Sequence, residues 1–233
     1  MGRLNDIQSD NKGLTLVELL VTLAVSAVLA AAVSLMIGYS VNTYQNENVN
    51  ISVQSELQTN VNQIMDAIMS SSGAVIQKKD ATTTDYAGFG QFKETYKANG
   101  DLDHVDFTGT VFFSGSSGEI YLGRGTGTGG TAKVAVEAVV DPLKTAVAAD
   151  GRPYLLGQNA QTFWISIDTS TASKCIDSTT STYKNPLTVN VQLEFKKNGA
   201  GKVFEKKVTD NATMRNKVTA DIYIDGVRYK LAK

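Results

Sequence analysis

Cysteine and histidine are nearly absent from this chain of 233 residues, which has one of each, Cys175 and His104. A single cysteine excludes an internal disulfide bond. Neither residue has a recognisable general base or orienting group beside it, which a nucleophilic catalyst would need. The sequence shows no other catalytic arrangement, so we predict that the protein is not an enzyme and that it needs no cofactor.

A strong net charge is also lacking, because 22 basic and 23 acidic residues give a formal charge of -1. This balance argues against a dedicated nucleic-acid-binding protein. The charges are unevenly spread, however: acidic residues outnumber basic ones ten to five over residues 80–150, and basic residues outnumber acidic ones ten to four over residues 196–233. The densest basic segment supplies a candidate patch of four residues: Lys196, Lys197, Lys206 and Lys207.

Three interpretations of that asymmetry remain open. The basic patch could meet the acidic face of a neighbouring subunit, it could contact DNA phosphates, or its lysines could simply lie on solvated strand faces. Salt dependence separates the first two interpretations from the third, because screening weakens exposed charge contacts.

Proline is absent before Pro142, and the N-terminal region contains a long apolar stretch over residues 14–37. Its length is sufficient for a transmembrane helix, which needs about 20 residues. Glu18 is its only charged residue. A buried carboxylate is costly and requires a partner. Because Arg3 and Lys12 precede the stretch, we expect the N-terminus in the cytoplasm and the remainder exported.

The junction before this stretch reads Lys12-Gly13-Leu14-Thr15-Leu16-Val17-Glu18. This segment resembles the prepilin processing motif of the type IV pilin and pseudopilin superfamily. The resemblance implies that a prepilin peptidase cuts between Gly13 and Leu14 and methylates the new terminal amine. It also implies that Glu18, the fifth mature residue, pairs with the N-terminal ammonium of a neighbouring subunit in a filament.

The apolar stretch passes into a polar segment in which apolar residues recur at helical spacing. We therefore predict one continuous helix over residues 14–72, membrane-spanning over 14–37 and amphipathic over 38–72. Its exposed face should be rich in amides, including Asn60 and Gln63. Gly73 suits the left-handed residue that often ends a helix. The predicted domains are a leader over 1–13, this helix, and a β-rich headpiece over 73–233.

Alternation of apolar and polar residues predicts strands in the headpiece. The clearest is Thr188 to Phe195, and Asp225-Gly226 is a strong hairpin signal between residues 221–224 and 227–231. The further strand candidates are 105–113, 119–122, 133–140, 162–167 and 202–208. Residues 76–104 and 168–187 are expected to be irregular. The predicted fold class is α+β, a long N-terminal helix packed on an antiparallel sheet as in pilins.

Two further patterns suggest ligands only weakly. Residues 125–130 fit G-x-G-x-x-G, but the fingerprint has meaning only in a βαβ unit, and a flexible exposed loop is the default interpretation. Asp101, Asp103 and Asp106 surround His104, but the spacing and glycine of an EF-hand are missing. We therefore predict no metal site and expect an exposed acidic strand edge.

These observations together predict a prepilin. The expected function is that of a structural subunit, a minor pilin or pseudopilin, in a type IV pilus or a related secretion or competence filament. The expected partners are the prepilin peptidase, other pilin subunits and the cytoplasmic membrane, followed by location in an extracellular pilus or a pseudopilus. Alternatives are an adhesin or DNA-uptake receptor on the same scaffold, binding DNA or a surface ligand, and, less favoured, a membrane-anchored enzyme.

Overall fold

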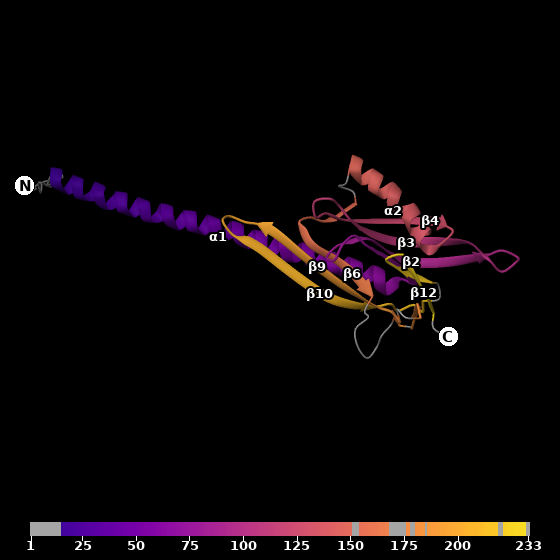
Figure 1. The fold of residues 1–233 in the computed structure, drawn as a ribbon. Coiled ribbons are helices and arrows are strands. Elements are labelled where there is room, and N and C mark those ends of the chain that lie inside the picture. The colour runs from indigo at the N-terminus through magenta and orange to yellow at the C-terminus, as the bar shows by residue number, and fades with distance from the viewer. Residues whose placement is uncertain are drawn as a thin grey trace, which may run out of the picture. The chain divides into compact units, whose positions relative to one another are not determined.

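The computed structural model describes residues 15–150, 154–167, 176–177, 180–184, 186–218 and 221–231. The predicted α+β class is confirmed: a long helix, α1 (Leu16–Ser70), is followed by a mostly antiparallel β-sheet domain (Figure 1). The chain forms two compact units, Met1–Glu47 and Asn48–Lys233. The division falls within α1, so each part of the helix is described with its own unit.

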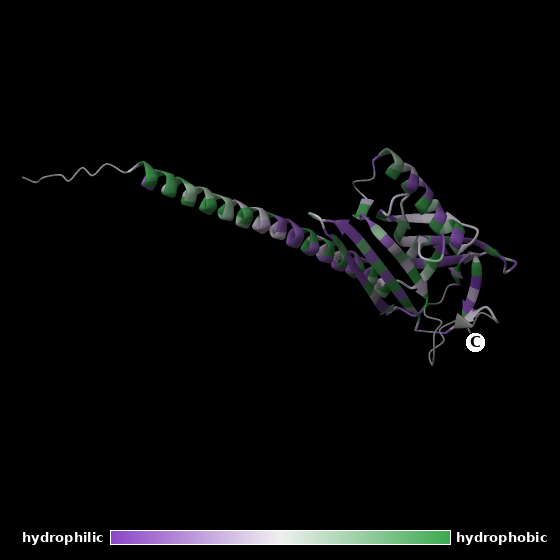
Figure 2. Ribbon diagram, turned by 60° about the vertical axis from the view of Figure 1, so that its left-hand side comes forward, coloured by the Kyte–Doolittle hydropathy of each residue, from purple (hydrophilic) through white to green (hydrophobic). Residues whose placement is uncertain are grey.

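In the first unit, the described residues include none outside α1 that buries the apolar side chains of the helix. Thr15 caps it, because its Oγ1 accepts a hydrogen bond from the backbone N–H of Glu18 at 3.3 Å. The apolar side chains that follow are exposed, and this stretch is long and apolar enough to cross a membrane (Figure 2). Leu23 is 64% exposed and Val28 70%, values that a water-soluble surface helix would not sustain along its whole circumference.

In the second unit, one face of α1 is buried. Its core residues are spaced three or four apart, which puts them on one side of the helix: Val53, Leu57, Val61, Ile64 and Ile68. Asn60 is also buried, so its predicted place on the exposed face was wrong. The spacing explains the difference, because Asn60 lies between Leu57 and Ile64 on the inward side.

The helix ends without the predicted left-handed glycine. Ser71 and Ser72 donate their backbone N–H groups to Ile68 O at 3.2 Å and to Gly90 O at 2.9 Å. Gly73 is the first residue of a strand and is absent from the residues with positive φ. Its glycine is needed for a different reason: a Cβ there would lie 2.4 Å from the ring of Phe92.

The main sheet has nine strands in the order β5-β4-β3-β2-β1-β11-β12-β8-β7. Neighbours are antiparallel except for β1 with β11 and β12 with β8, which are parallel. The strands are β1 (Gly73–Lys78), β2 (Thr84–Tyr96), β3 (Leu102–Ser114), β4 (Ile120–Gly129), β5 (Leu155–Gly157), β7 (Ile176–Asp177), β8 (Thr182–Tyr183), β11 (Ile222–Ile224) and β12 (Val227–Leu231).

A second, three-stranded sheet has the order β10-β9-β6. Its strands are β6 (Ala160–Ile167), β9 (Thr188–Asn198) and β10 (Val203–Thr213). Burial alternates along β9 from Val189 to Phe195, as its sequence predicts, and Figure 2 shows the same alternation in hydropathy. The inner face of this sheet packs with the buried face of α1 and one face of the main sheet in a single core.

A second core lies on the opposite face of the main sheet, under helix α2 (Ala132–Ala149). The prediction of a strand over residues 133–140 was therefore wrong. Thr131 caps α2, accepting the backbone N–H of Val134 at 3.3 Å. The buried residues follow a helical period that outweighs the strand preference of valine: Ala132, Ala135, Val136, Val139 and Val140.

The predicted glycine loop over residues 125–130 was also wrong, because β4 continues to Gly129. Alternate glycines of β4 face α2, and a Cβ on Gly127 would lie 2.1 Å from the carbonyl oxygen of Ala135. Close approach of the helix therefore explains the glycines, and no phosphate loop is required. The strand leads into α2 from an antiparallel sheet, which differs from the βαβ unit of a dinucleotide site.

Two remaining predictions have mixed outcomes. Residues 76–104, expected to be irregular, contain the end of β1 and all of β2, whose partners are supplied by distant segments. Residues 168–187 lie mostly outside the described residues. The hairpin signal is confirmed, because Asp225 and Gly226 have φ of 51° and 78°, as a type I′ turn between β11 and β12 requires.

Candidate functional site

Glu18 lies in the first turn of α1 and is exposed in its unit. The helix dipole favours a carboxylate at this end. Lys and Arg are absent from the sequence Leu16–Ser70, so no residue of the helix can neutralise the carboxylate. Within the described part of the chain Glu18 forms no ion pair. The helix therefore presents an unpaired carboxylate in an apolar setting. The predicted cleavage site, Gly13 and Leu14, lies outside the described residues.

Residues 8–34 match the family model of the prokaryotic N-terminal methylation motif. The chain carries the type IV pilin signature. This pilin motif covers both the predicted cleavage site and Glu18, and it implies processing by prepilin peptidase and assembly with other pilin subunits. No curated protein and no solved structure matches the chain.

The four lysines of the basic patch in this pilin-like chain are divided between two faces of the second sheet. In the β9–β10 ladder Lys196 lies opposite Glu205, and Lys207 lies opposite Glu194. The side chains of adjacent strand residues point to opposite faces, so Lys197 and Lys206 lie on the other face.

On the outer face, each lysine thus has a glutamate as its cross-strand neighbour, an arrangement that reduces the local positive charge. Lys197 instead extends toward α1, where its Nζ donates to Ser52 Oγ at 3.4 Å. Because of this register, the four lysines lie two on each face of the sheet and do not form a single row on one face.

The acidic segment around His104 forms a local network at the end of the β2–β3 hairpin. His104 Nδ1 lies 2.9 Å from Asp103 Oδ2, and Nε2 lies 3.7 Å from Asp106 Oδ2. Thr128 donates to Asp106 at 2.7 Å. No group of three or more His, Cys, Asp or Glu residues that could hold a metal occurs among the described residues. Cys175 lies outside them.

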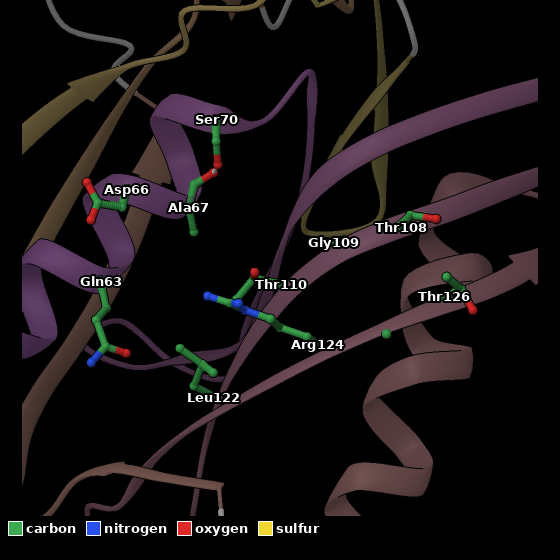
Figure 3. A pocket seen from close by; sticks show the side chains of 11 residues that line it. Gln63, Asp66, Ala67, Ser70, Thr108, Gly109, Thr110, Leu122, Arg124 and Thr126 are labelled. Carbon is green, nitrogen blue, oxygen red and sulfur yellow. Dashed lines mark hydrogen bonds between the residues drawn. The ribbon is translucent and has the colours of Figure 1, made fainter.

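A groove between α1 and strands β3 and β4 was not predicted from the sequence. It has a volume of about 690 Å³, and α1 supplies one wall while the sheet supplies the other (Figure 3). Its polar lining side chains are Gln63, Asp66, Ser70, Thr108, Thr110, Arg124 and Thr126. A sequence signal was present in the alternation Arg-Gly-Thr-Gly-Thr over residues 124–128, whose polar residues share one strand face. That alternation can be interpreted only when residues 124–128 are known to form a strand.

The headpiece also holds a shielded tyrosine. Tyr86 of β2 is 4% exposed and donates its hydroxyl to Glu137 Oε1 of α2 at 2.7 Å. Burial, followed by the hydrogen bond and charge of Glu137, raises the pKa of Tyr86 well above its ordinary value of 10. Tyr86 is thus a neutral hydrogen-bond donor that fastens α2 to the sheet, and we assign it no chemistry.

Proposed function

We propose that this protein is a structural subunit of a type IV pilus or a related secretion or competence filament. In this proposal it is cleaved after Gly13, inserted through the apolar part of α1, and assembled by packing that helix against those of other subunits. The cytoplasmic membrane holds the precursor with the headpiece outside, and the extracellular pilus or pseudopilus holds the mature protein. No catalytic role is proposed.

The observation that carries the proposal is Glu18 in a helix without any cation. Insertion of a comparable charge costs about 2.5–3.5 kcal/mol at the bilayer centre, and Glu18, which lies nearer one end of the apolar stretch, carries part of that cost in an isolated membrane helix. Cleavage after Gly13 creates an ammonium group on Leu14, four residues before Glu18. The same group on a second subunit supplies the missing cation when helices pack side by side.

Mass spectrometry of the N-terminus, in cells with and without prepilin peptidase, tests the proposal. The expected mature chain begins at a methylated Leu14 only when the peptidase is present. A chain that still begins at Met1 in cells with active peptidase would overturn the proposal. In a separate arm, normal entry of Glu18→Ala into sheared filaments would remove the pairing role while leaving processing intact.

A finer assignment to a minor pilin or pseudopilin rests on the size of the headpiece, which extends from residue 73 to 233. The number of copies per sheared filament tests it, because a minor subunit should be rare. The second candidate function is a pilin-like adhesin, favoured by the polar groove. DNA uptake is less favoured than at the sequence level, since the β9–β10 register divides the lysines between two faces.

A further inference from the structure

The β9–β10 hairpin extends beyond the third strand of its sheet. Strand β6 pairs with β9 only as far as Ala160 opposite Phe195, whereas β9 and β10 stay paired as far as Asn198 opposite Val203. Residues 196–203, called the hairpin tip below, therefore project past β6. The tip is closed by the turn at Gly199, whose backbone N–H donates to Lys202 O at 2.7 Å.

Within its unit, the hairpin runs along α1 in the direction opposite to the helix. Arg215, two residues after β10 ends, donates its backbone N–H to Met69 O at 3.2 Å, near the C-terminal end of α1. At the other end of the hairpin, Lys197 Nζ donates to Ser52 Oγ at 3.4 Å. Figure 1 shows the same course. The tip therefore lies at the end of the second unit where α1 enters it.

The tip is basic and partly apolar. It contains Lys196, Lys197 and Lys202 and no acidic residue. Glu205, opposite Lys196, offsets one of these charges, so the end of the hairpin keeps a net charge of +2. Val203, beside Lys202, is 51% exposed. Exposed apolar residues among lysines are typical of segments that lie on a lipid surface, whereas nucleic-acid phosphates gain nothing from a valine.

The opposite end of the headpiece is acidic. Ser72, two residues after α1 ends, donates its backbone N–H to Gly90 O at 2.9 Å, and β2 continues from there to Tyr96. The end of the β2–β3 hairpin therefore lies away from the β9–β10 turn, as Figure 1 shows. Over residues 93–106, four acidic residues oppose two lysines. The charge asymmetry of the sequence is thus an asymmetry between two ends of the headpiece.

The basic end is the one nearer in sequence to the predicted membrane span. From Ile37, where the span ends, to Ser52 the chain is fifteen residues of continuous helix, about 22 Å long. The hairpin turn continues from Lys197 toward Asn48, and lipid headgroups extend roughly 6 Å beyond the hydrocarbon. The remaining gap is on the order of one Debye length at 0.1 M salt, about 10 Å, so charges on the lipid surface act on the tip.

We propose that the hairpin tip contacts the surface of the membrane from which α1 emerges, with its three lysines beside the phosphates of anionic lipids. The same surface repels the acidic β2–β3 hairpin, so both ends orient the headpiece with the tip toward the bilayer before assembly. This inference rests on the proposed function, because it requires the apolar part of α1 in the membrane and the headpiece outside.

Lysine labelling in vesicles tests the proposal. The full chain is inserted at high dilution into vesicles of phosphatidylcholine, with or without phosphatidylglycerol, and an uncharged amine reagent is added. Mass spectrometry then gives the labelling rate of each lysine. We expect Lys196 and Lys202 to be labelled at least about threefold more slowly in the anionic vesicles. The difference should disappear in about 1 M NaCl, where the Debye length is about 3 Å.

Lys97, at the acidic end, is the matched control, since its side chain is 58% exposed. Its labelling rate should be the same in both kinds of vesicle. Lys202→Glu should reduce the slowing at Lys196, and Lys97→Glu should leave it unchanged. Equal rates for the tip lysines in the two kinds of vesicle, or equal slowing at Lys97, would overturn the proposal. Slowing that depends on crowding of the chains and not on lipid charge would assign the tip to another subunit instead.

Flotation with phosphatidylcholine vesicles separates this inference from the proposed function, because α1 should insert into neutral lipid without help from the lysines. A chain that floats with neutral vesicles but shows equal labelling rates would remove only the lipid contact of the tip. A chain that floats with neither kind of vesicle would remove the membrane anchoring in the proposed function and this contact with it.

Discussion

The two parts of α1 belong to one continuous helix, but their apolar side chains are exposed in the first part and buried in the second. Over Leu16–Glu47 the apolar side chains are exposed around the helix, and no residue of this unit that the structure describes covers them. Over Asn48–Ser70 the apolar residues form one stripe that is buried by two sheets. Both parts form the same helix, but different partners bury their apolar residues: lipid and other subunits for the first part in the proposal, and the headpiece for the second part in the structure.

The largest expected effect comes from removing core volume in the second part of α1. Ile64 is fully buried, and Ile64→Ala should lower the free energy of unfolding by about 2–5 kcal/mol, because it leaves a cavity. Ile51, which is 61% exposed, is the matched control. Ile51→Ala should change the free energy of unfolding by less than about 0.5 kcal/mol. Urea unfolding of the full chain in detergent can be followed by fluorescence of Trp164, the only tryptophan. Equal losses would show that the headpiece does not hold this part of the helix.

A lysine introduced into α1 should be tolerated in the second part of the helix and disfavoured in the first, the reverse of the pattern expected for substitutions to alanine. Val25→Lys places a cation within the exposed apolar part and should cost about 2.5–3.5 kcal/mol of membrane insertion near the bilayer centre. Gln58→Lys, on the exposed side of the second part, should be tolerated. Membrane fractionation of cells that express each variant measures the difference. Normal membrane recovery of Val25→Lys would contradict the assignment of the first part to lipid.

Two glutamates provide a smaller test. The carboxylate of Glu56 accepts the backbone N–H of Gln158 at 2.8 Å, whereas Glu47, exposed in the first unit, has no such bond. Glu56→Ala should therefore lower headpiece stability by about 1 kcal/mol, and Glu47→Ala should leave it unchanged. The same Trp164 unfolding curves report both values. A loss for Glu47→Ala as large as that for Glu56→Ala would show that charge alone, without the bond, is responsible.

The smallest effect is confined to alkaline pH. The folded pKa of Tyr86 is raised above its unfolded value of 10, so the unfolded chain loses this proton first. The contribution of Tyr86 to the stability of the folded protein is fully present below pH 10 and is lost as pH rises toward the folded pKa. Tyr86→Phe should therefore flatten the alkaline decline in melting temperature, and exposed Tyr44→Phe should not. A decline of unchanged slope in Tyr86→Phe would assign it to other groups.

Local signals predicted some elements well and others badly. The Asp225-Gly226 turn and the alternation of β9 depend on neighbouring residues, so both were readable in the sequence. The glycines of β4 were misread because their role is to admit α2, a contact between segments. The error in α2 was avoidable, since its buried residues have helical spacing.

The candidate sites divide in the same way. The processing segment and Glu18 are contiguous in sequence, and the motif identified them without a fold. Contiguity misled for the lysines, because adjacent strand residues point to opposite faces. The groove is lined by residues of segments far apart in the sequence, such as Gln63 of α1 and Arg124 of β4, which no local pattern could indicate.

The sequence by itself determined the pilin motif, the apolar helix and its unpaired carboxylate, because each depends on composition and spacing along a short segment. Only the tertiary structure decided that one side of α1 from Asn48 onward is buried by two sheets while another side forms the wall of a polar groove. The physical reason is that burial and pairing depend on which distant segments pack together. A stripe of apolar residues predicts that one face of a helix is buried, whereas the tertiary fold determines which segments bury it.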